Sequence, residues 1–253
     1  MSTLKERIVD YESNYDFKLI KKLPLVINLN GRSFKKNTSL LPKPYSTKFF
    51  EAICSSVIKL ASEIDGTVFV YSFNDEIIII SKNNQTIDTE MWYDGNLQKI
   101  NSAAASIATL SFYKAAEEFG LNIIGDPTFI SKSFVVPSIS EVVNFLIYKQ
   151  HQAYYSAVSF SCFYELSKKF DIDYVNKILL NTTIDDKIDI LLEKCDIDFN
   201  DYPIPFRKGI GCYRIPKLVK KPNGENELKN KLFIDLNLPS FNKNQEFLYN
   251  ILK

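Results

Sequence analysis

The sequence predicts an α+β fold, and three observations lead to that prediction. Strand-like and helix-like patterns follow one another in the order β-α-β-β-α-β between residues 23 and 137. After Pro137 the pattern becomes mainly helical. The 253 residues are 45% hydrophobic and 24% charged, a composition typical of a soluble globular chain that buries a sizeable core without help from disulfides or metals.

The first predicted strand covers residues 23–29, a short run of apolar and β-branched side chains. It runs into Asn30-Gly31, a pair typical of turns. A helix is predicted over residues 46–64, where apolar side chains recur at helical spacing behind Ser46, a suitable N-cap. The sequence therefore begins with a strand that turns into a helical crossover.

Two further strands are predicted over residues 67–71 and 77–80, with the polar residues 72–76 between them. Asn74 and Asp75 are expected at the tip of this tight hairpin, because Asn and Asp favour turns.

A long helix is predicted over residues 96–119, and the small residues in its middle allow close packing on a sheet. Residues 129–136 form the fourth predicted strand, which Pro137 ends. The complete order is the split βαβ pattern of ferredoxin-like folds, an arrangement that polymerase palms share.

This topology brings distant residues together. A helical crossover returns the second strand parallel to the first, so the end of the first strand and the tip of the hairpin lie at the same edge of the sheet. Although they are about 45 positions apart, Asn30-Gly31 and Asp75-Glu76 are expected to be neighbours.

The C-terminal half is predicted to be a helical extension that ends in strands. We expect residues 1–137 to form a palm-like core, and residues 138–253 to pack on it as part of one compact unit. Helices are expected at 140–170 and 173–194. Strands are expected at 210–215 and 232–236. Between these strands lies a basic stretch, residues 217–231, with a turn at 222–224.

Composition excludes several classes of protein. The net charge is +1, so only a basic face hidden inside a neutral total would attract nucleic acid. Four scattered cysteines and the single histidine, His151, argue against a zinc site and indicate reduced thiols. With no signal core and no apolar run near the roughly 20 residues that cross a bilayer, we expect a cytoplasmic protein with no membrane partner.

Two short motifs suit phosphate chemistry. Two-metal sites need carboxylates close together, and Asp75-Glu76 offers such a pair at the mouth of a buried hairpin. Gly31 allows close backbone approach to an anion, and the basic side chains that follow it suit phosphates. On spacing alone each motif also fits an ordinary solvated turn, so neither is specific.

Taken together, six segments in order between about residue 20 and residue 215 resemble the tRNA(His) guanylyltransferase-like family. The similarity is closer to its bacterial and archaeal-type members than to the eukaryotic enzyme. The segments are 28–34 (NLNGRSF), 42–45 (PKPY), 73–76 (FNDE), 92–99 (WYDGNLQK), 129–150 and 206–209 (FRKG).

The resemblance implies a nucleotidyltransferase that adds nucleotides to the 5′ end of tRNA, opposite in direction to ordinary polymerases. It implies two Mg²⁺ ions, GTP and ATP as substrates, tRNA as partner and a homo-tetramer.

It also assigns roles to residues of this chain. Metal would be bound by Asp75, the Gly31 carbonyl and Asn30, with Glu76 beside them in the catalytic group. The nucleotide site would comprise Asn30, Gly31, Arg32, Ser33, Phe34, Lys35, Asn74, Asp75 and Lys99. RNA would be held by Lys149, Gln150, Arg207 and Lys208.

The sequence departs from the family at two places that bear on activity. Asn30 stands where the family has a carboxylate that contacts both metals, and an amide oxygen brings no charge, so Mg²⁺ affinity is expected to fall. Residues 152–157 match neither family subgroup in a helix tied to recognition of the tRNA end. Two alternatives follow: a palm that binds nucleotide or RNA without catalysis, or a palm enzyme with another nucleotide product.

Overall fold

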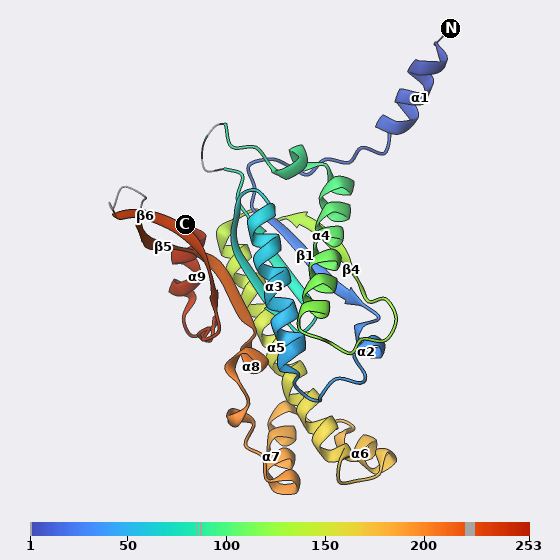
Figure 1. Ribbon diagram of the computed structural model, residues 1–253, viewed down its shortest axis with the longest axis vertical. Helices are drawn as coiled ribbons and strands as arrows, with labels where there is room; N and C mark the ends of the chain where they lie inside the picture. The colour runs from blue at the N-terminus through green and yellow to red at the C-terminus, as the bar shows by residue number, and fades with distance from the viewer. Residues whose placement is uncertain (1, 85, 87, 221–225) are drawn as a thin grey trace.

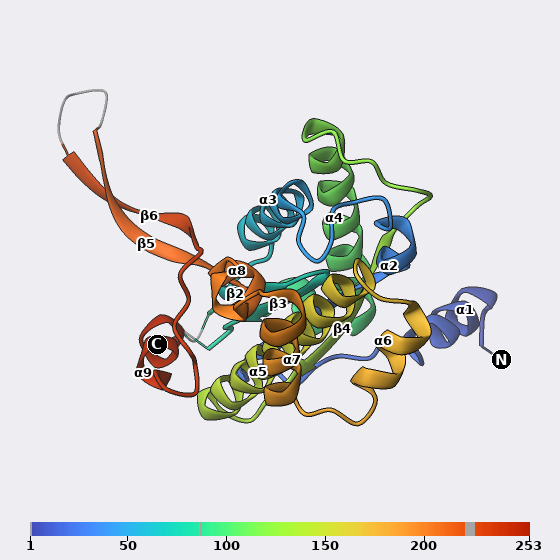
Figure 2. The same ribbon diagram turned by 90° about the horizontal axis from the view of Figure 1, so that it is seen from below.

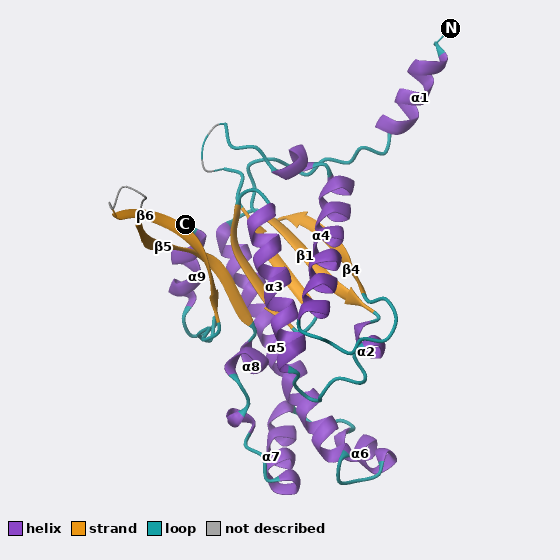
Figure 3. Cartoon of the chain, in the orientation of Figure 1, coloured by secondary structure: helices purple, strands orange, loops and turns teal. Residues whose placement is uncertain are grey.

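The computed structural model describes residues 2–84, 86, 88–220 and 226–253. The predicted α+β class is confirmed: helices surround one six-stranded sheet with the strand order β4-β1-β3-β2-β5-β6 (Figures 1 and 3). The strands are β1 Leu25–Arg32, β2 Thr67–Phe73, β3 Glu76–Ser81, β4 Thr128–Val135, β5 Ile210–Lys220 and β6 Asn226–Asp235.

Helices cover both faces of this sheet. Those of the N-terminal half are α1 Leu4–Ser13, α2 Phe34–Asn37, α3 Thr47–Glu63 and α4 Leu97–Glu118, with the 3₁₀ turn η1 Trp92–Gly95. Those of the C-terminal half are α5 Ile139–Ser167, α6 Ile172–Leu179, α7 Ile184–Cys195, α8 Ile204–Lys208 and α9 Gln245–Leu252, with the 3₁₀ turn η2 Phe199–Asp201.

The order β4-β1-β3-β2 is that of a ferredoxin-like palm, as predicted. Because β3 pairs antiparallel with both β1 and β2, those two strands run parallel to each other. α3 and α4 lie on one face of the sheet and α5 lies on the other (Figure 2).

The central strand β3 explains why the sequence carries four consecutive isoleucines. Ile77 and Ile79 belong to the core under α3 and α4, whereas Ile78 and Ile80 belong to the core under α5. All four are fully buried. Burial of one such side chain stabilises a fold by roughly 1.5–3 kcal/mol, so this strand fixes the sheet between its two helical layers.

The predicted helix starts are set by side-chain caps. The Ser46 hydroxyl accepts a hydrogen bond from the Phe49 amide at the start of α3. Asn96 caps α4 in the same way. α5 begins at Ile139, one residue before the expected start at 140, because Ser138 is its N-cap, and it continues as one helix of 29 residues.

Two sequence-based expectations are wrong. The chain does not turn at Asn30-Gly31, because β1 is paired on both sides and continues to Arg32. The turn follows at Ser33, whose φ is +66°. The late strands are longer than the predicted 210–215 and 232–236, because β5 continues to Lys220 and β6 starts at Asn226, where the two strands pair with each other. The turn expected at 222–224 lies outside the described residues.

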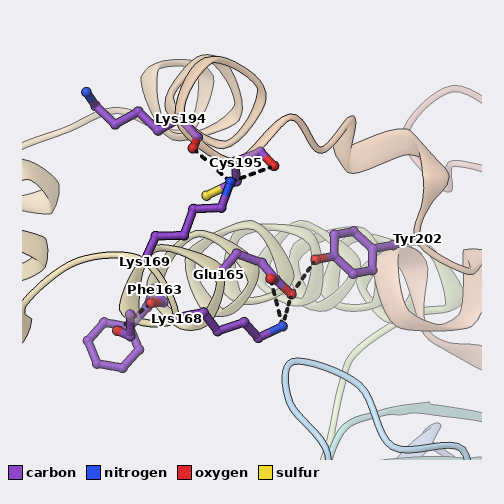
Figure 4. A network of polar contacts seen from close by, with 8 residues as sticks. Phe163, Glu165, Lys168, Lys169, Lys194, Cys195 and Tyr202 are labelled. Atoms are coloured by element: carbon purple, nitrogen blue, oxygen red, sulfur yellow. Dashed lines mark hydrogen bonds and ion pairs between the residues drawn. The ribbon is translucent and has the colours of Figure 1, made fainter.

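The C-terminal half completes both the sheet and one of its cores. β5 adds to the sheet edge by pairing with β2. Figure 4 shows how the end of α5 is tied down: the Lys169 ammonium donates to the carbonyl oxygens of Lys194 and Cys195, each at 3.3 Å, at the end of α7. Glu165 accepts a hydrogen bond from the Tyr202 hydroxyl.

Two further expectations concern the chain as a whole. All four cysteines are free thiols, as predicted. Among the described residues, no helix is both long and apolar enough to cross a membrane.

Candidate nucleotide and metal site

The predicted meeting of β1 with the hairpin tip is confirmed. The Gly31 amide donates a hydrogen bond of 2.9 Å to the Asp75 carbonyl oxygen. Asn30 is the register partner of Glu76 across β1 and β3. Asn74 forms the turn in the left-handed conformation, with a φ of +49°. Two segments that are far apart in the sequence thus form one edge.

Gly31 allows Asp75 to pack directly on the strand. A Cβ atom at position 31 would lie 2.5 Å from a ring carbon of Phe34 and 2.7 Å from the Asp75 Cβ, and still closer to the Asp75 carboxylate. No other residue type fits there without movement of the hairpin or of Phe34.

Burial raises the pKa of the Asp75 carboxyl, and the neighbouring Glu76 charge raises it further. A hydrogen bond to the residue's own backbone and the Lys43 charge lower it. Among the described residues, Asp75 forms no ion pair. A buried carboxylate of this kind is a group that a cation would stabilise.

The second acidic residue is already neutralised. The Lys149 ammonium of α5 lies 2.6 Å from a Glu76 carboxylate oxygen, and both side chains are largely buried. Asn30 shares a sheet face with Glu76, as paired residues do, and its amide donates to the Asn28 side chain at 3.4 Å.

These donors fit one Mg²⁺ ion better than two. Asp75 supplies a carboxylate, while Asn30 and the Gly31 carbonyl supply neutral oxygens, and Mg²⁺ commonly uses one or two carboxylates together with substrate phosphates. A second ion would need another free carboxylate, but Glu76 is held by Lys149. Within the described part of the chain, no three acidic, cysteine or histidine side chains form a metal-binding group.

A pocket opens beside this junction. It encloses about 950 Å³, part of it open to solvent, between the hairpin tip, α2, the loop before α3, α5 and α8. Its lining includes Phe34, Lys35, Thr38, Lys43, Tyr45, Phe49, Phe50, Asn74, Asp75, Phe160, Tyr164 and Phe206.

The end of the pocket near Asp75 is basic. Lys43 is half-buried, and its ammonium donates to the Thr38 hydroxyl at 3.4 Å. Burial lowers the pKa of Lys43, while the Asp75 charge opposes that shift. Lys35 lies exposed on the pocket wall. Sequence reasoning had not chosen Lys43 as a site residue, although it lies in the family-like PKPY segment.

The other predicted phosphate-binding residues are divided between solvent and core. Arg32 and Ser33 are exposed at the end of β1. The Phe34 ring lies in the core, with ring centroids 4.9 Å from both Phe112 and Phe129. Phe34 therefore supports the loop and one pocket wall, while the charged contacts are left to its neighbours.

The far end of the pocket is aromatic. Phe160 and Tyr164 stack on successive turns of α5, with centroids 5.7 Å apart and an interplanar angle of 24°. Tyr45 and Phe206, which also line the pocket, form an edge-to-face pair with ring centroids 5.7 Å apart. The only sequence signal for the first pair is its i, i+4 spacing, which core aromatics also show.

Lys99 is not brought to this junction within the chain. It is exposed near the start of α4, at the other end of the sheet. Thr109, farther along α4, marks the part of the helix that lies near the junction. Its hydroxyl accepts a hydrogen bond from the amide of Phe129, which is the register partner of Gly31. Lys99 lies ten positions before Thr109, which is about 15 Å along a helix.

Gln150 does not face the solvent, contrary to an RNA-binding role. It is 5% exposed. Its amide donates to the Lys208 and Pro239 carbonyls and accepts from the Phe241 amide. Gln150 therefore holds the segments before β5 and after β6 against α5.

The remaining predicted RNA contacts lie around the pocket rim. Lys149 is occupied by Glu76. The Arg207 guanidinium donates to the Tyr202 carbonyl at 2.8 Å and to the Asn200 side chain at 3.2 Å. The half-exposed Lys208 ends α8, directly before β5 begins. Of the four, Lys208 offers its charge most freely.

Fold and site together define a palm-type protein of the nucleotidyltransferase class. The family model described as Thg1, tRNAHis guanylyltransferase, matches residues 5–137, which is more than half of the chain. The chain belongs to the tRNA(His) guanylyltransferase-like (Thg1) family of nucleotidyltransferases.

Individual relatives agree with this assignment. A probable tRNA(His) guanylyltransferase of Dictyostelium discoideum is 24% identical over 225 residues, 86% of each chain. A bacterial Thg1-like protein in complex with ATP has a similar structure, with a TM-score of 0.82 and 27% identity over 99% of both chains. A bacterial Thg1-like protein in complex with GTP shares the fold, with a TM-score of 0.76 and 24% identity over 99% of both chains.

Proposed function

We propose that this chain binds a nucleoside triphosphate in the pocket beside Gly31 and Asp75, and uses it to add nucleotides to the 5′ end of tRNA. The observation that carries the proposal is the junction of these two residues beside a pocket that is basic at one end and aromatic at the other. The ATP and GTP complexes of the bacterial structural relatives support it.

The two ends of the pocket suit the two ends of a nucleotide. Lys43 and Lys35 place positive charge near the hairpin tip, where a triphosphate would lie. The stacked pair Phe160 and Tyr164 provides an aromatic wall for a base. ATP and GTP both satisfy this arrangement.

Phosphoryl transfer depends mostly on positioning and on charge. When bound, Mg²⁺ would neutralise phosphate oxygens beside Asp75, Asn30 and the Gly31 carbonyl. The lysines of the pocket would share that neutralisation, and the buried walls would limit access of water to the phosphates. The tRNA 5′ end would approach across the rim near Lys208.

A second candidate function is favoured by Asn30 and by the Glu76–Lys149 pair. Both reduce the negative charge available for metal ions. A palm with such a site would bind nucleotide or RNA without transferring a nucleotide. Incorporation of labelled GTP into tRNA separates the two functions.

Isothermal titration of the protein with ATP in the presence of Mg²⁺ tests the nucleotide site. We expect binding that weakens at least tenfold in Lys43→Ala. The matched control is Lys48→Ala, which removes an exposed lysine on the nearby α3. Absence of ATP binding, or an equal loss in both variants, contradicts the proposed site.

The proposal also includes assembly as a homo-tetramer and action in the cytoplasm. The first follows from the family resemblance, and sedimentation at four times the chain mass of 29.1 kDa tests it. The second follows from the composition, and microscopy of the tagged protein tests it.

A further inference from the structure

The hairpin of β5 and β6 extends well beyond the sheet that it joins. β2 pairs with β5 only from Ile210 to Tyr213. Farther along, β5 pairs with β6 alone as far as Lys220 opposite Asn226. We call residues 214–220 and 226–232 the arm, which projects away from the helical layers in Figure 2.

The arm is firmly rooted. The Tyr213 hydroxyl donates a 2.9 Å hydrogen bond to Asp235, and its ring contacts those of Phe69 and Phe233. On the other face, the Arg214 guanidinium donates to the carbonyl oxygen of Thr67 at 2.8 Å. These contacts fix the direction in which the strands leave the body.

Positive charge gathers on one face of the arm. Lys217 lies directly opposite Lys229, and Lys231 lies opposite Ile215, so the three lysines share a face that we call the basic face. Like charges directly opposite each other destabilise a hairpin. The one ion pair on this face among the described residues joins Lys229 to Glu227 at 3.2 Å. The face therefore retains an excess of positive charge that an anion would neutralise.

The opposite face of the arm is different. Leu218 lies opposite Leu228, and both side chains are about two-thirds exposed (66% and 65%). The two-residue period of the strands thus places Lys217, Lys229 and Lys231 on one side of the ribbon and the two leucines on the other. A partner that binds these three lysines would lie along the basic face.

β5 also connects the candidate site to the arm. Phe206 and Ile210 line the pocket, so β5 starts at its rim, next to Lys208. The seven residues from Ile210 to Lys217 span about 23 Å of strand. A free nucleotide is too short to join the pocket to the basic face, whereas a nucleic-acid backbone is long enough.

We propose that the basic face of the arm, Lys217, Lys229 and Lys231, binds the phosphate backbone of an RNA whose 5′ end lies at the pocket. The inference rests on the proposed function and names a contact surface for its RNA substrate. Lys208 at the rim and the three lysines of the arm would follow one strand of the RNA away from its end.

The test is the affinity for a tRNA(His) transcript over a range of salt concentrations, measured by filter binding without nucleotide. The variant is Lys217→Ala/Lys229→Ala/Lys231→Ala. Each lost phosphate contact reduces the slope of log K against log salt by about 0.7–0.9. We expect affinity to fall at least tenfold near 0.1 M salt and the slope to shrink by about 2–3. Lys→Arg at the same three positions should restore both.

A matched control removes three exposed lysines elsewhere: Lys59→Ala/Lys114→Ala/Lys177→Ala. Equal losses in the two triple variants, or no loss in the arm variant, overturn the proposal. A fall in oligomer mass with unchanged tRNA affinity overturns it too, and assigns the arm to a second copy of the chain.

The same proteins are titrated with ATP. If the unaltered protein binds tRNA through the arm but does not bind ATP, the pocket proposal fails and the arm proposal stands. If it binds ATP but the arm variant keeps full tRNA affinity, only the arm proposal fails.

Discussion

The Gly31 amide is hydrogen-bonded to the Asp75 carbonyl oxygen at 2.9 Å, and the Asp75 side chain fills the space where a residue at position 31 would carry its Cβ. The first strand and the acidic hairpin are therefore held in contact at the edge of the sheet. The geometry of the candidate site depends on this contact, because the pocket opens beside it.

Gly31→Ala tests the contact directly. The new methyl group would overlap Phe34 and Asp75, so the hairpin tip has to move. We expect a loss of about 1–3 kcal/mol in the free energy of unfolding, as for other overpacked sites, and at least a tenfold loss of ATP affinity. Urea denaturation and ATP titration measure the two effects.

Gly120→Ala is the control for a glycine substitution away from the junction. Unlike Gly31, Gly120 has a positive φ, +61°, and its added Cβ would meet only the end of the Lys48 side chain, at 3.7 Å. We expect a loss of about 1–2 kcal/mol in stability with unchanged ATP affinity. Unchanged ATP affinity in Gly31→Ala would show that the junction does not shape the pocket.

Local rules predicted much of this site. The two short apolar runs on either side of a polar break and the turn preference of Asn74-Asp75 placed the hairpin, and the crossover rule placed it beside Gly31. The end of β1 was missed because Asn30-Gly31 is a turn pair in isolation, whereas β3 and β4 hold it extended from both sides.

Other parts depend on long-range placement. Phe160 and Tyr164 reach the pocket because α5 crosses the sheet as one unbroken helix, and their spacing alone equally fits a core. Lys99 was expected at the site, but α4 starts at the far end of the sheet. Most of the arm, residues 216–220 and 226–231, was not predicted as strand, because its lysines conceal the alternation that marks one.

Lys149→Met tests the buried pair next to the junction. The change leaves the largely buried Glu76 carboxylate without its partner, and we expect the free energy of unfolding to fall by about 2–4 kcal/mol. Glu76→Gln/Lys149→Met should recover most of that loss, since neither charge then remains. Equal stability of the single and double variants would show that the pair does not neutralise Glu76.

Phe160→Ala/Tyr164→Ala tests the aromatic wall. Stacking on an aromatic ring contributes about 1–3 kcal/mol per base, so we expect ATP and GTP to bind at least fivefold more weakly. Phe170→Ala is the control, because Phe170 is as exposed as Phe160 (37% and 36%) but is not part of the pocket lining. Full affinity in the double variant would place the base elsewhere.

The thiols give a prediction about pH. Burial raises the pKa of Cys54 to about 12 and that of Cys212 to about 11. An acid whose pKa is raised on folding contributes stability below its unfolded pKa, near 8.5–9, and that contribution is lost as pH rises toward 11–12. We therefore expect both thiols to react with Ellman's reagent far more slowly at pH 8 in the folded protein than in urea. Equal rates would contradict their burial.

The most direct test of the central claim is incorporation of labelled GTP into a tRNA(His) transcript that lacks its 5′ nucleotide. The unaltered chain and Asn30→Asp are compared over a series of Mg²⁺ concentrations with ATP present. Because Asn30 lacks the charge of a carboxylate, we predict incorporation by both proteins, with Asn30→Asp at least tenfold faster at about 1 mM Mg²⁺. No incorporation by either protein would contradict the assignment of the Gly31–Asp75 junction as a nucleotidyl-transfer site.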